Sequence, residues 1–312
     1  MARTVRSIVP LRRKPADHMD FGRVHGTFQY EFNRKASPAA RAEQVALWNR
    51  YIPLTPEQAA KILTRDLPKD TAVTFKLEKD GSGEFNIYAL NKFDDEASFD
   101  LTDKSLDAGT IRVQDAYMGQ GIGRKLIRNQ VEFFHACGVR TFDISAQFEN
   151  GGYTWARVGF LPDDVRDDNL KEDVAEPARR TIDMLAPLLE PAEKKKLRRY
   201  LQFKKKEDLW RVADSDIDLG PRLKDVFSRA AAKKGDKKQA QYAREYLELL
   251  KTHFTYDLFD YMESQAKKGK PVNVGRLLLT GTSWTGAIDM NNPKQMKRLG
   301  NYTGGWKHIK IG

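Results

Sequence analysis

The stretch that decides the fold is GTIRVQDAYMGQGIGRKL, residues 109–126. It opens with a short β-branched segment, residues 109–113, which predicts a strand. Glycines follow at positions 119, 121 and 123. Glycines spaced in this way let several consecutive backbone N–H groups face one point, and they let a ligand approach the main chain closely.

A helix is predicted directly after the glycines. Ile122, Leu126, Phe133 and Cys137 fall on one apolar stripe at helical spacing, and Gly138 is a suitable C-terminal cap. The next segment, VRTFDIS at residues 139–145, has the pattern of a second strand. Strand, glycine turn, helix and strand together predict a βαβ unit with a parallel strand pair.

The chemistry predicted for the glycine loop is anion binding. The N-terminal end of the helix carries a partial positive charge, and Arg124 and Lys125 add mobile cations. A cradle for a phosphate or diphosphate is therefore expected. No G-x-x-x-x-G-K-[ST] pattern is present, which argues against a nucleotide-hydrolysing P-loop. The candidate binding residues of the loop are Met118, Gly119, Gln120, Gly121, Ile122, Gly123, Arg124 and Lys125.

This stretch resembles the acyl-CoA-binding motif of the GNAT superfamily of N-acetyltransferases, which typically has V-x-P-x-Y-R-G-x-G-[IL]-G at a strand end. The positions in register are Val113, Tyr117, Gly119, Gly121, Ile122 and Gly123. The sequence departs from the motif where proline is common, since Asp115 and Ala116 stand there, and Met118 replaces the usual Arg or Gln. The methionine removes one side-chain donor and leaves the backbone cradle intact.

A second match lies downstream, where YTWARVGF at residues 153–160 resembles the A-x-x-x-Y-x-x-x-G-F helix end of the same family. The wider form GGYTWARVGF also looks like variants in large phage virion-associated proteins. Together the two matches cover about residues 71–160.

The resemblance implies acetyl-CoA, or another acyl-CoA, as cofactor, with the pyrophosphate on the glycine loop. The pantetheine arm would hydrogen-bond the end of the preceding strand, at Ile111, Arg112 and Val113, where the strand pair splays apart. An amine would then attack the thioester directly, and its proton would pass to a general base.

The catalytic groups are less well marked than the cofactor loop. The tyrosine that usually acts as general acid is replaced by Trp155, an indole that cannot transfer a proton near neutral pH. Trp155 is then a wall of the pantetheine or acyl pocket, or a core residue. Tyr153 is the acid only if its segment is not yet helical; otherwise it is a packing tyrosine.

No general base is identified by the sequence. Asp115 and Glu149 are the candidates, because both lie near predicted strand ends, and Asp94-Asp95-Glu96 is expected in a loop. The alternative for each is an ordinary solvated carboxylate.

The fold class expected is α/β (α+β), a GNAT-like mixed sheet with the βαβ unit and a helical insertion or C-terminal helical domain. Further strands are predicted at residues 71–77, 84–90 and 98–101, and a capped helix from Thr55 to about Thr64. Residues 276–290 have a strand-like pattern and are expected to return to the sheet. The predicted domains are a basic arm (1–26), an acyl-CoA-binding domain (27–163), a helical basic insertion (164–270) and a returning strand with a basic, Gly- and Asn-rich tail (271–312).

Composition excludes several classes of site. The chain has 312 residues and one cysteine, Cys137, so an internal disulfide and a multi-cysteine metal centre are ruled out. None of the five histidines has metal-ligand spacing. No apolar run approaches the ~18 residues of a membrane span. A cytoplasmic protein is expected, in a host cytoplasm or a virion if a phage encodes it.

The charge is strongly basic, with 54 Lys and Arg against 43 Asp and Glu. Residues 1–50 and 194–206 hold dense basic runs, which indicate contact with a polyanion such as nucleic acid, or simply a solvated face. Two functions follow. The first is an acyl-CoA-dependent N-acyltransferase acting on an amine-bearing acceptor. The alternative is a non-catalytic, GNAT-like component of a phage particle or other large assembly.

Overall fold

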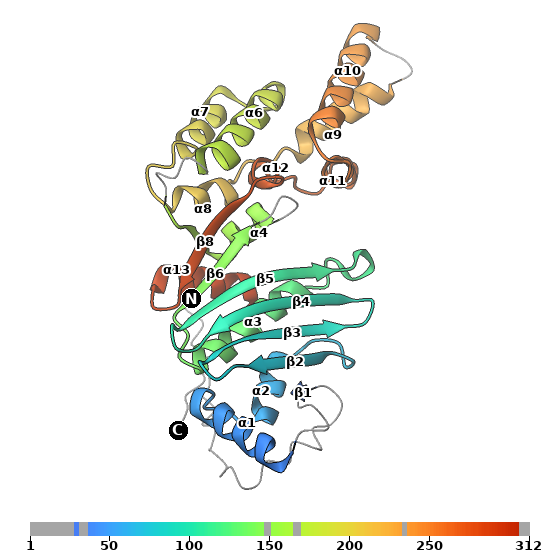
Figure 1. Ribbon diagram of the computed structural model, residues 1–312. Helices are drawn as coiled ribbons and strands as arrows, with labels where there is room; N and C mark the ends of the chain where they lie inside the picture. The colour runs from blue at the N-terminus through green and yellow to red at the C-terminus, as the bar shows by residue number, and fades with distance from the viewer. Residues whose placement is uncertain (1–27, 31–36, 147–150, 165–169, 233–235, 306–312) are drawn as a thin grey trace, which may run out of the picture. The chain divides into compact units, whose positions relative to one another are not determined.

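A computed structural model describes residues 28–30, 37–146, 151–164, 170–232 and 236–305 (Figure 1). The predicted arm, residues 1–26, and Glu149 lie outside these residues. The chain divides into two compact units. The first unit comprises Met1–Ser145 and Ala287–Gly312, and the second comprises Ala146–Gly286.

The first unit is built on a mixed sheet. In the described residues its strands follow the order β1-β2-β3-β4-β5-β6-β8, of which β8 belongs to this unit from Ala287 on. Strands β2, β3, β4 and β5 pair antiparallel with one another, whereas β1 is parallel to β2 and β6 is parallel to β5. The mixed α/β class predicted from the sequence is confirmed. The strands are β1 (Phe28–Tyr30), β2 (Ala72–Leu77), β3 (Ser82–Ala89), β4 (Phe93–Asp100), β5 (Ser105–Val113), β6 (Thr141–Ala146) and β8 (Trp284–Asp289).

Helices cover one face of this sheet. Helix α3 (Ile122–Ala136) lies behind the strands in Figure 1 and forms the βαβ crossover between β5 and β6. Its Phe133 ring meets Phe75 of β2 at 5.8 Å, and Phe134 meets Phe85 of β3 at 5.0 Å. The other helices of this unit are α1 (Pro38–Tyr51), α2 (Pro56–Leu63) and α13 (Pro293–Thr303). Helix α2 has the predicted capping box between Thr55 and Gln58.

Strand β4 differs from its prediction. The acids Asp94-Asp95-Glu96 were assigned to a loop, but the strand spans Phe93–Asp100 and includes them. Phe93, Asp95, Ala97 and Phe99 alternate inward and are buried, while the intervening residues face the open side of the sheet. The three consecutive acids interrupt the alternation of apolar and polar residues that predicts a strand, so the sequence pattern did not indicate one here.

The second unit is mainly helical. In the described residues its helical segments are α4 (Gly151–Val158), η3 (Lys171–Ala175), α6 (Glu176–Met184), η4 (Ala186–Leu188), α7 (Pro191–Tyr200), α8 (Asp208–Ala213), α9 (Gly220–Ala231), α10 (Lys237–His253), α11 (Tyr256–Lys267) and α12 (Val274–Leu279). A two-residue strand, β7 (Leu161–Pro162), lies beside the start of β8. The predicted helical stretch 164–270 falls within this unit.

Two C-terminal predictions need correction in part. The stretch 276–290 returns to the sheet as predicted, but only as β8 from Trp284. Its first part belongs to helix α12, because Asn273 caps that helix by accepting from the Arg276 backbone amide. The tail, expected without regular structure, contains α13. Asn292 caps its start, Pro293 occupies its first turn and Gly304, with φ 79°, ends it. Caps rather than apolar period define both helices.

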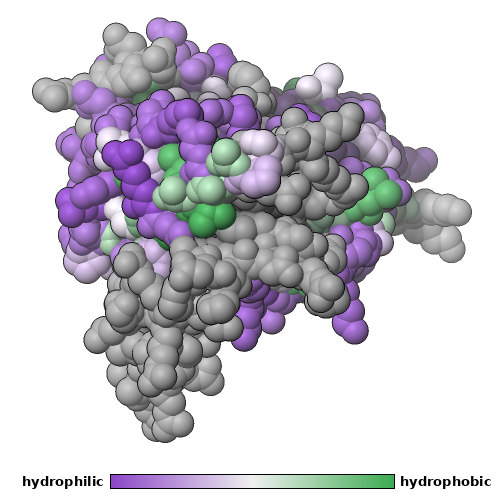
Figure 2. Space-filling model, turned by 60° about the horizontal axis from the view of Figure 1, so that its bottom comes forward, coloured by the Kyte–Doolittle hydropathy of each residue, from purple (hydrophilic) through white to green (hydrophobic). Residues whose placement is uncertain are grey.

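The surface is hydrophilic over most of the described part that Figure 2 shows, with a small group of hydrophobic residues. The mean hydropathy of −0.64 agrees with this view. Within the described residues no helix has both the length and the apolar character that crossing a bilayer requires.

Candidate functional site

The glycine loop connects β5 to α3 in the first unit. After Val113 the chain makes one tight helical turn, Asp115–Tyr117, and then passes through Gly119 and Gly121. These glycines have φ of 78° and 74°, in the left-handed region that side chains disfavour. Gly121 is the N-cap of α3 and has no side chain with which to cap it. The sequence therefore leaves the start of this helix without an internal cap.

The backbone amides of the loop are open. Within the described part of the chain, the N–H groups of Gly119 and of residues 121–124 have no hydrogen-bond partner. A Cβ placed on Gly119, Gly121 or Gly123 would meet nothing within 4 Å. The loop thus combines backbone amides without a partner and glycines whose Cβ positions are open, the two features that an anion cradle needs.

The side chains of the loop take different positions. Met118 is 58% exposed. Gln120 turns back and its Nε2 donates to the Ala116 carbonyl at 3.2 Å. The Arg124 guanidinium lies 5.7 Å from the ring centroid of Tyr302 on α13, and Lys125 is half-buried. Sequence reasoning did not find Tyr302, because α13 was not predicted.

The end of β5 beside the loop is unpaired on its β6 side. The parallel pairing runs from Ser105 opposite Thr141 to Ala108 opposite Ile144. Strand β5 then continues through residues 109–113, and no described strand pairs with that edge. This segment holds Ile111, Arg112 and Val113.

A β-bulge sets the direction of this segment. The β4–β5 register shifts between Glu96 and Ala97, so Gly109 has no partner on β4. A Cβ at Gly109 would lie 2.5 Å from the Glu96 carbonyl oxygen, which makes glycine necessary there. The bulge lies where β5 leaves β6.

A buried polar pair lies beside the bulge. Asp95 of β4 is 1% exposed and pairs in register with Ile111 of β5. Its Oδ2 accepts a hydrogen bond from Nε2 of Gln130 on α3, a side chain that is fully buried. Burial, reinforced by the neighbouring Asp94 and Glu96, raises the pKa of Asp95 to about 8. The sequence analysis, which expected a loop here, missed this group.

The predicted acid–base residues are separated. Asp115 is exposed at the loop. Tyr153 and Trp155 belong to α4 in the second unit. Because α4 begins at Gly151, Tyr153 and Trp155 point about 200° apart around the helix.

The surroundings of Tyr153 and Trp155 are those of packed side chains. Burial raises the pKa of Tyr153, and this effect outweighs the opposing charges of Arg157 and Arg276, so its phenol is protonated at neutral pH. Trp155 meets Phe160 edge-on at 5.0 Å, so the indole packs on the Gly-Phe turn.

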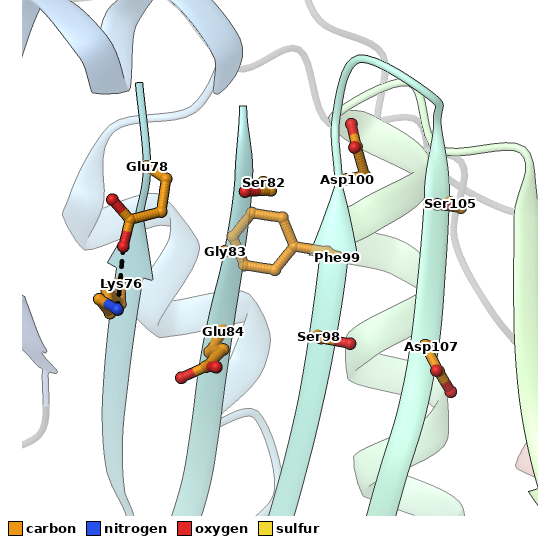
Figure 3. A pocket seen from close by; sticks show the side chains of 10 residues that line it. All are labelled: Lys76, Glu78, Ser82, Gly83, Glu84, Ser98, Phe99, Asp100, Ser105 and Asp107. Carbon is orange, nitrogen blue, oxygen red and sulfur yellow. Dashed lines mark ion pairs between the residues drawn. The ribbon is translucent and has the colours of Figure 1, made fainter. Parts of the chain in front are cut away.

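The open face of the sheet has a depression that is lined by residues of the strands and not by the glycine loop. It measures about 380 Å³ and lies over β2 to β5 (Figure 3). On the inner face Gly83 is opposite Phe99, and a Cβ on Gly83 would lie 2.4 Å from the Phe99 ring. Lys76 and Glu78 pair across the rim of the depression at 2.9 Å.

The basic run 194–206 is partly neutralised within its own unit. Lys196 pairs with Asp216 at 2.7 Å, and Arg198 pairs with Asp183. Lys206 donates to the Asp163 carbonyl. Lys195, Lys204 and Lys205 are exposed, and their side chains have no partner among the described residues. Among those residues no group of three or more His, Cys, Asp or Glu is arranged to hold a metal ion.

Comparison with known proteins gives little. No family model matches the chain, and no curated protein matches it. Among solved structures, a nourseothricin acetyltransferase is similar with a TM-score of 0.23 and 20% identity, over 28% of this chain and 54% of that one. The chain thus matches about half the length of that enzyme, and a likeness of this size assigns no family.

Proposed function

We propose that this protein is an acyl-CoA-dependent N-acyltransferase whose glycine loop binds the diphosphate of the cofactor. The observation that carries the proposal is the row of unpartnered amides at Gly119 and residues 121–124, directly after the unpaired end of β5. Open amides at a helix N-terminus bind phosphate groups. The motif resemblance in residues 113–123 supports acetyl-CoA, or another acyl-CoA, as the ligand.

Each part of the site has a role in this proposal. The amides and Arg124, held against Tyr302, bind the diphosphate. The free edge of β5 at Ile111 to Val113 hydrogen-bonds the extended amide arm of the cofactor, as an added strand would. An amine of the acceptor then attacks the thioester carbon. The C–N bond forms, the C–S bond breaks, and the amine loses a proton, for which Asp115 is the described carboxylate nearest in sequence to the loop.

The thiolate that leaves does not require a strong acid. Thiols have a pKa near 8.5, so solvent protonates the product readily. Trp155 at the usual tyrosine position therefore lowers the rate without preventing the reaction. Tyr153 keeps its proton at neutral pH, but it lies within α4, so the condition under which it would act as the acid is not met.

A second candidate function is a non-catalytic, GNAT-like component of a phage particle or other assembly. The observation that favours it is Trp155, because its indole packs against Phe160 and cannot transfer a proton. This candidate predicts either no cofactor binding or binding without turnover. It also accommodates the dense basic runs in residues 1–50 and 194–206 as contacts to a polyanion.

Calorimetry with acetyl-CoA tests the proposal. Gly123 has ordinary helical backbone and open space at its Cβ, so Gly123→Glu adds a negative charge at the cradle without backbone strain. Gly123→Gln is the matched neutral control. The wild type and the Gln variant should bind in the micromolar range, and the Glu variant at least about tenfold more weakly, or ~1.4 kcal/mol.

Two outcomes contradict the binding step: wild-type protein that does not bind, or Glu and Gln variants that bind equally well. Thiol release from acetyl-CoA in the presence of a panel of primary amines, including a lysine peptide, then separates the two candidate functions. Binding without release for any amine favours the non-catalytic component.

A further inference from the structure

We propose that Asp95 and Gln130 form a neutral carboxylic acid–amide pair that fixes helix α3, and with it the glycine loop, to strand β4 beside the bulge in its pairing with β5. Asp95 is then a positioning residue. The existence of the pair does not depend on the proposed function. Its effect on cofactor binding rests on that function.

The first argument is the hydrogen-bond inventory of Gln130. Its Nε2 donates to Oδ2 of Asp95, but its Oε1 is buried and has no hydrogen-bond partner among the described residues. A buried acceptor left without a donor is costly. An ionised carboxylate has only acceptors, so it cannot supply that donor.

A proton on Asp95 resolves this deficit. A carboxylic acid and a primary amide that face each other make two parallel hydrogen bonds. The amide N–H donates to one carboxyl oxygen, here Oδ2, and the acid O–H on Oδ1 donates to the amide oxygen, here Oε1 of Gln130. One proton therefore completes the pair, and both side chains lie in the core.

The electrostatic surroundings also favour the neutral acid. Asp95 is desolvated, and the flanking acids Asp94 and Glu96 on β4 disfavour a further negative charge, which together raise its pKa to about 8. On α3 the charged neighbours of Gln130 are already engaged: Arg128 pairs with Asp66 at 2.8 Å, and Glu132 pairs with Arg65 at 2.7 Å. On β5 the flanking charge is Arg112, which is exposed.

The position of the pair gives it a consequence for the site. Asp95 is opposite Ile111, in the part of β5 that leaves β6, and the bulge begins at the next residue, Glu96. Gln130 lies on the helix that starts at the glycine loop. The pair therefore ties the helix that presents the open amides to β4, the strand that pairs with the free-edged segment of β5.

The pH dependence of stability tests the proton. Between pH 3.8 and about 8 the unfolded carboxyl is ionised while the folded one holds a proton, so this group lowers stability as pH rises. Asp95→Asn needs no proton, because its amide donates to Oε1. The ratio of the wild-type to the Asp95→Asn folding equilibrium constant should fall about tenfold per pH unit from pH 5 to 7.5 and level off above 8.

The matched control is Asp107→Asn, an exposed acid on β5, for which the same ratio should stay flat. The carbon-13 carboxyl shift of Asp95 in the wild type reports the same proton directly, with a midpoint near pH 8. A flat ratio for Asp95→Asn, or a carboxyl that titrates near pH 4, overturns the neutral pair.

The amide signals of Gly121 and Gly123, recorded without cofactor, test the positioning role. In the wild type they should shift with the midpoint of Asp95, and in Asp95→Asn they should not. If the amide signals of Gly121 and Gly123 do not change as Asp95 titrates, the positioning role is wrong. Because neither measurement uses CoA, failure of cofactor binding would reject the proposed function and leave this result intact.

Discussion

At the scale of single residues, three glycines that look equivalent in the sequence have different roles. Gly119 and Gly121 adopt left-handed backbone, whereas Gly123 lies within the first turn of α3 with ordinary helical angles. All three have open space at the Cβ. Conformation rather than crowding therefore explains the first two, and neither requires a glycine at the third.

Replacing these glycines by alanine should separate the two effects on stability. Gly121→Ala should lower the free energy of unfolding by about 1–2 kcal/mol, because a Cβ disfavours the left-handed region. Gly123→Ala should raise it by up to about 1 kcal/mol through helix propensity. Urea unfolding measures both. Equal effects of the two substitutions would contradict the assigned backbone.

The sequence predicted the loop residues well and the acid–base residues poorly. Glycine spacing and the stripe from Ile122 to Phe133 are local signals, and both appear in the structure as a turn and a helix. Asp95 gave no such signal. Its burial depends on strands paired across the sheet, which no single stretch of sequence records. The contact between Tyr302 of α13 and Arg124 of α3 could not be predicted from the sequence either.

At the scale of elements, the bulge in the β4–β5 pair coincides with the point where β5 stops pairing with β6. Gly109→Val should distort it, because the Cβ would lie 2.5 Å from the Glu96 carbonyl oxygen. We expect a loss of about 1–3 kcal/mol in unfolding free energy, as for other overpacked sites, together with weaker cofactor binding. Thermal unfolding and calorimetry with acetyl-CoA measure the two effects.

The control for the bulge is Thr110→Val, a neighbouring exposed position where shape is preserved. Its unfolding free energy should stay within about 0.5 kcal/mol of the wild type. If Gly109→Val behaves like this control, the bulge does not require glycine.

Elements with strong caps or clear period were predicted, and those with mixed signals were not. The Thr55–Gln58 capping box gave α2 correctly. Apolar residues recur every four positions from Tyr242 to Met262, a period that fits one continuous helix. In the structure Thr255 caps a new helix, α11, and Tyr242 is 63% exposed. A period alone does not reveal that a chain stops and restarts its helix.

At the scale of the whole molecule, the two units have separate cores. Ile182, Leu185, Leu197 and Leu250 of the second unit are fully buried. We expect the fragment 146–286 to fold alone, with a helical circular-dichroism spectrum and a cooperative thermal transition. A fragment that melts without cooperativity would contradict this division of the chain.

The net charge of +11 should have a measurable effect on polyanion binding. If Lys195, Lys204 and Lys205 contact duplex DNA, each released counterion contributes about 0.9 to the slope of log affinity against log salt. Replacing all three by glutamine should reduce that slope by about 2.7. An unchanged slope in a filter-binding titration would show that this run is only a solvated face.

The most direct test of the central claim is an amide nitrogen–proton correlation spectrum of the full chain during titration with CoA. The open amides of Gly119 and residues 121–124 should show the largest, saturable shifts, because the diphosphate binds to them. Unchanged loop signals at high CoA concentration, or shifts confined to other parts of the chain, would contradict the account.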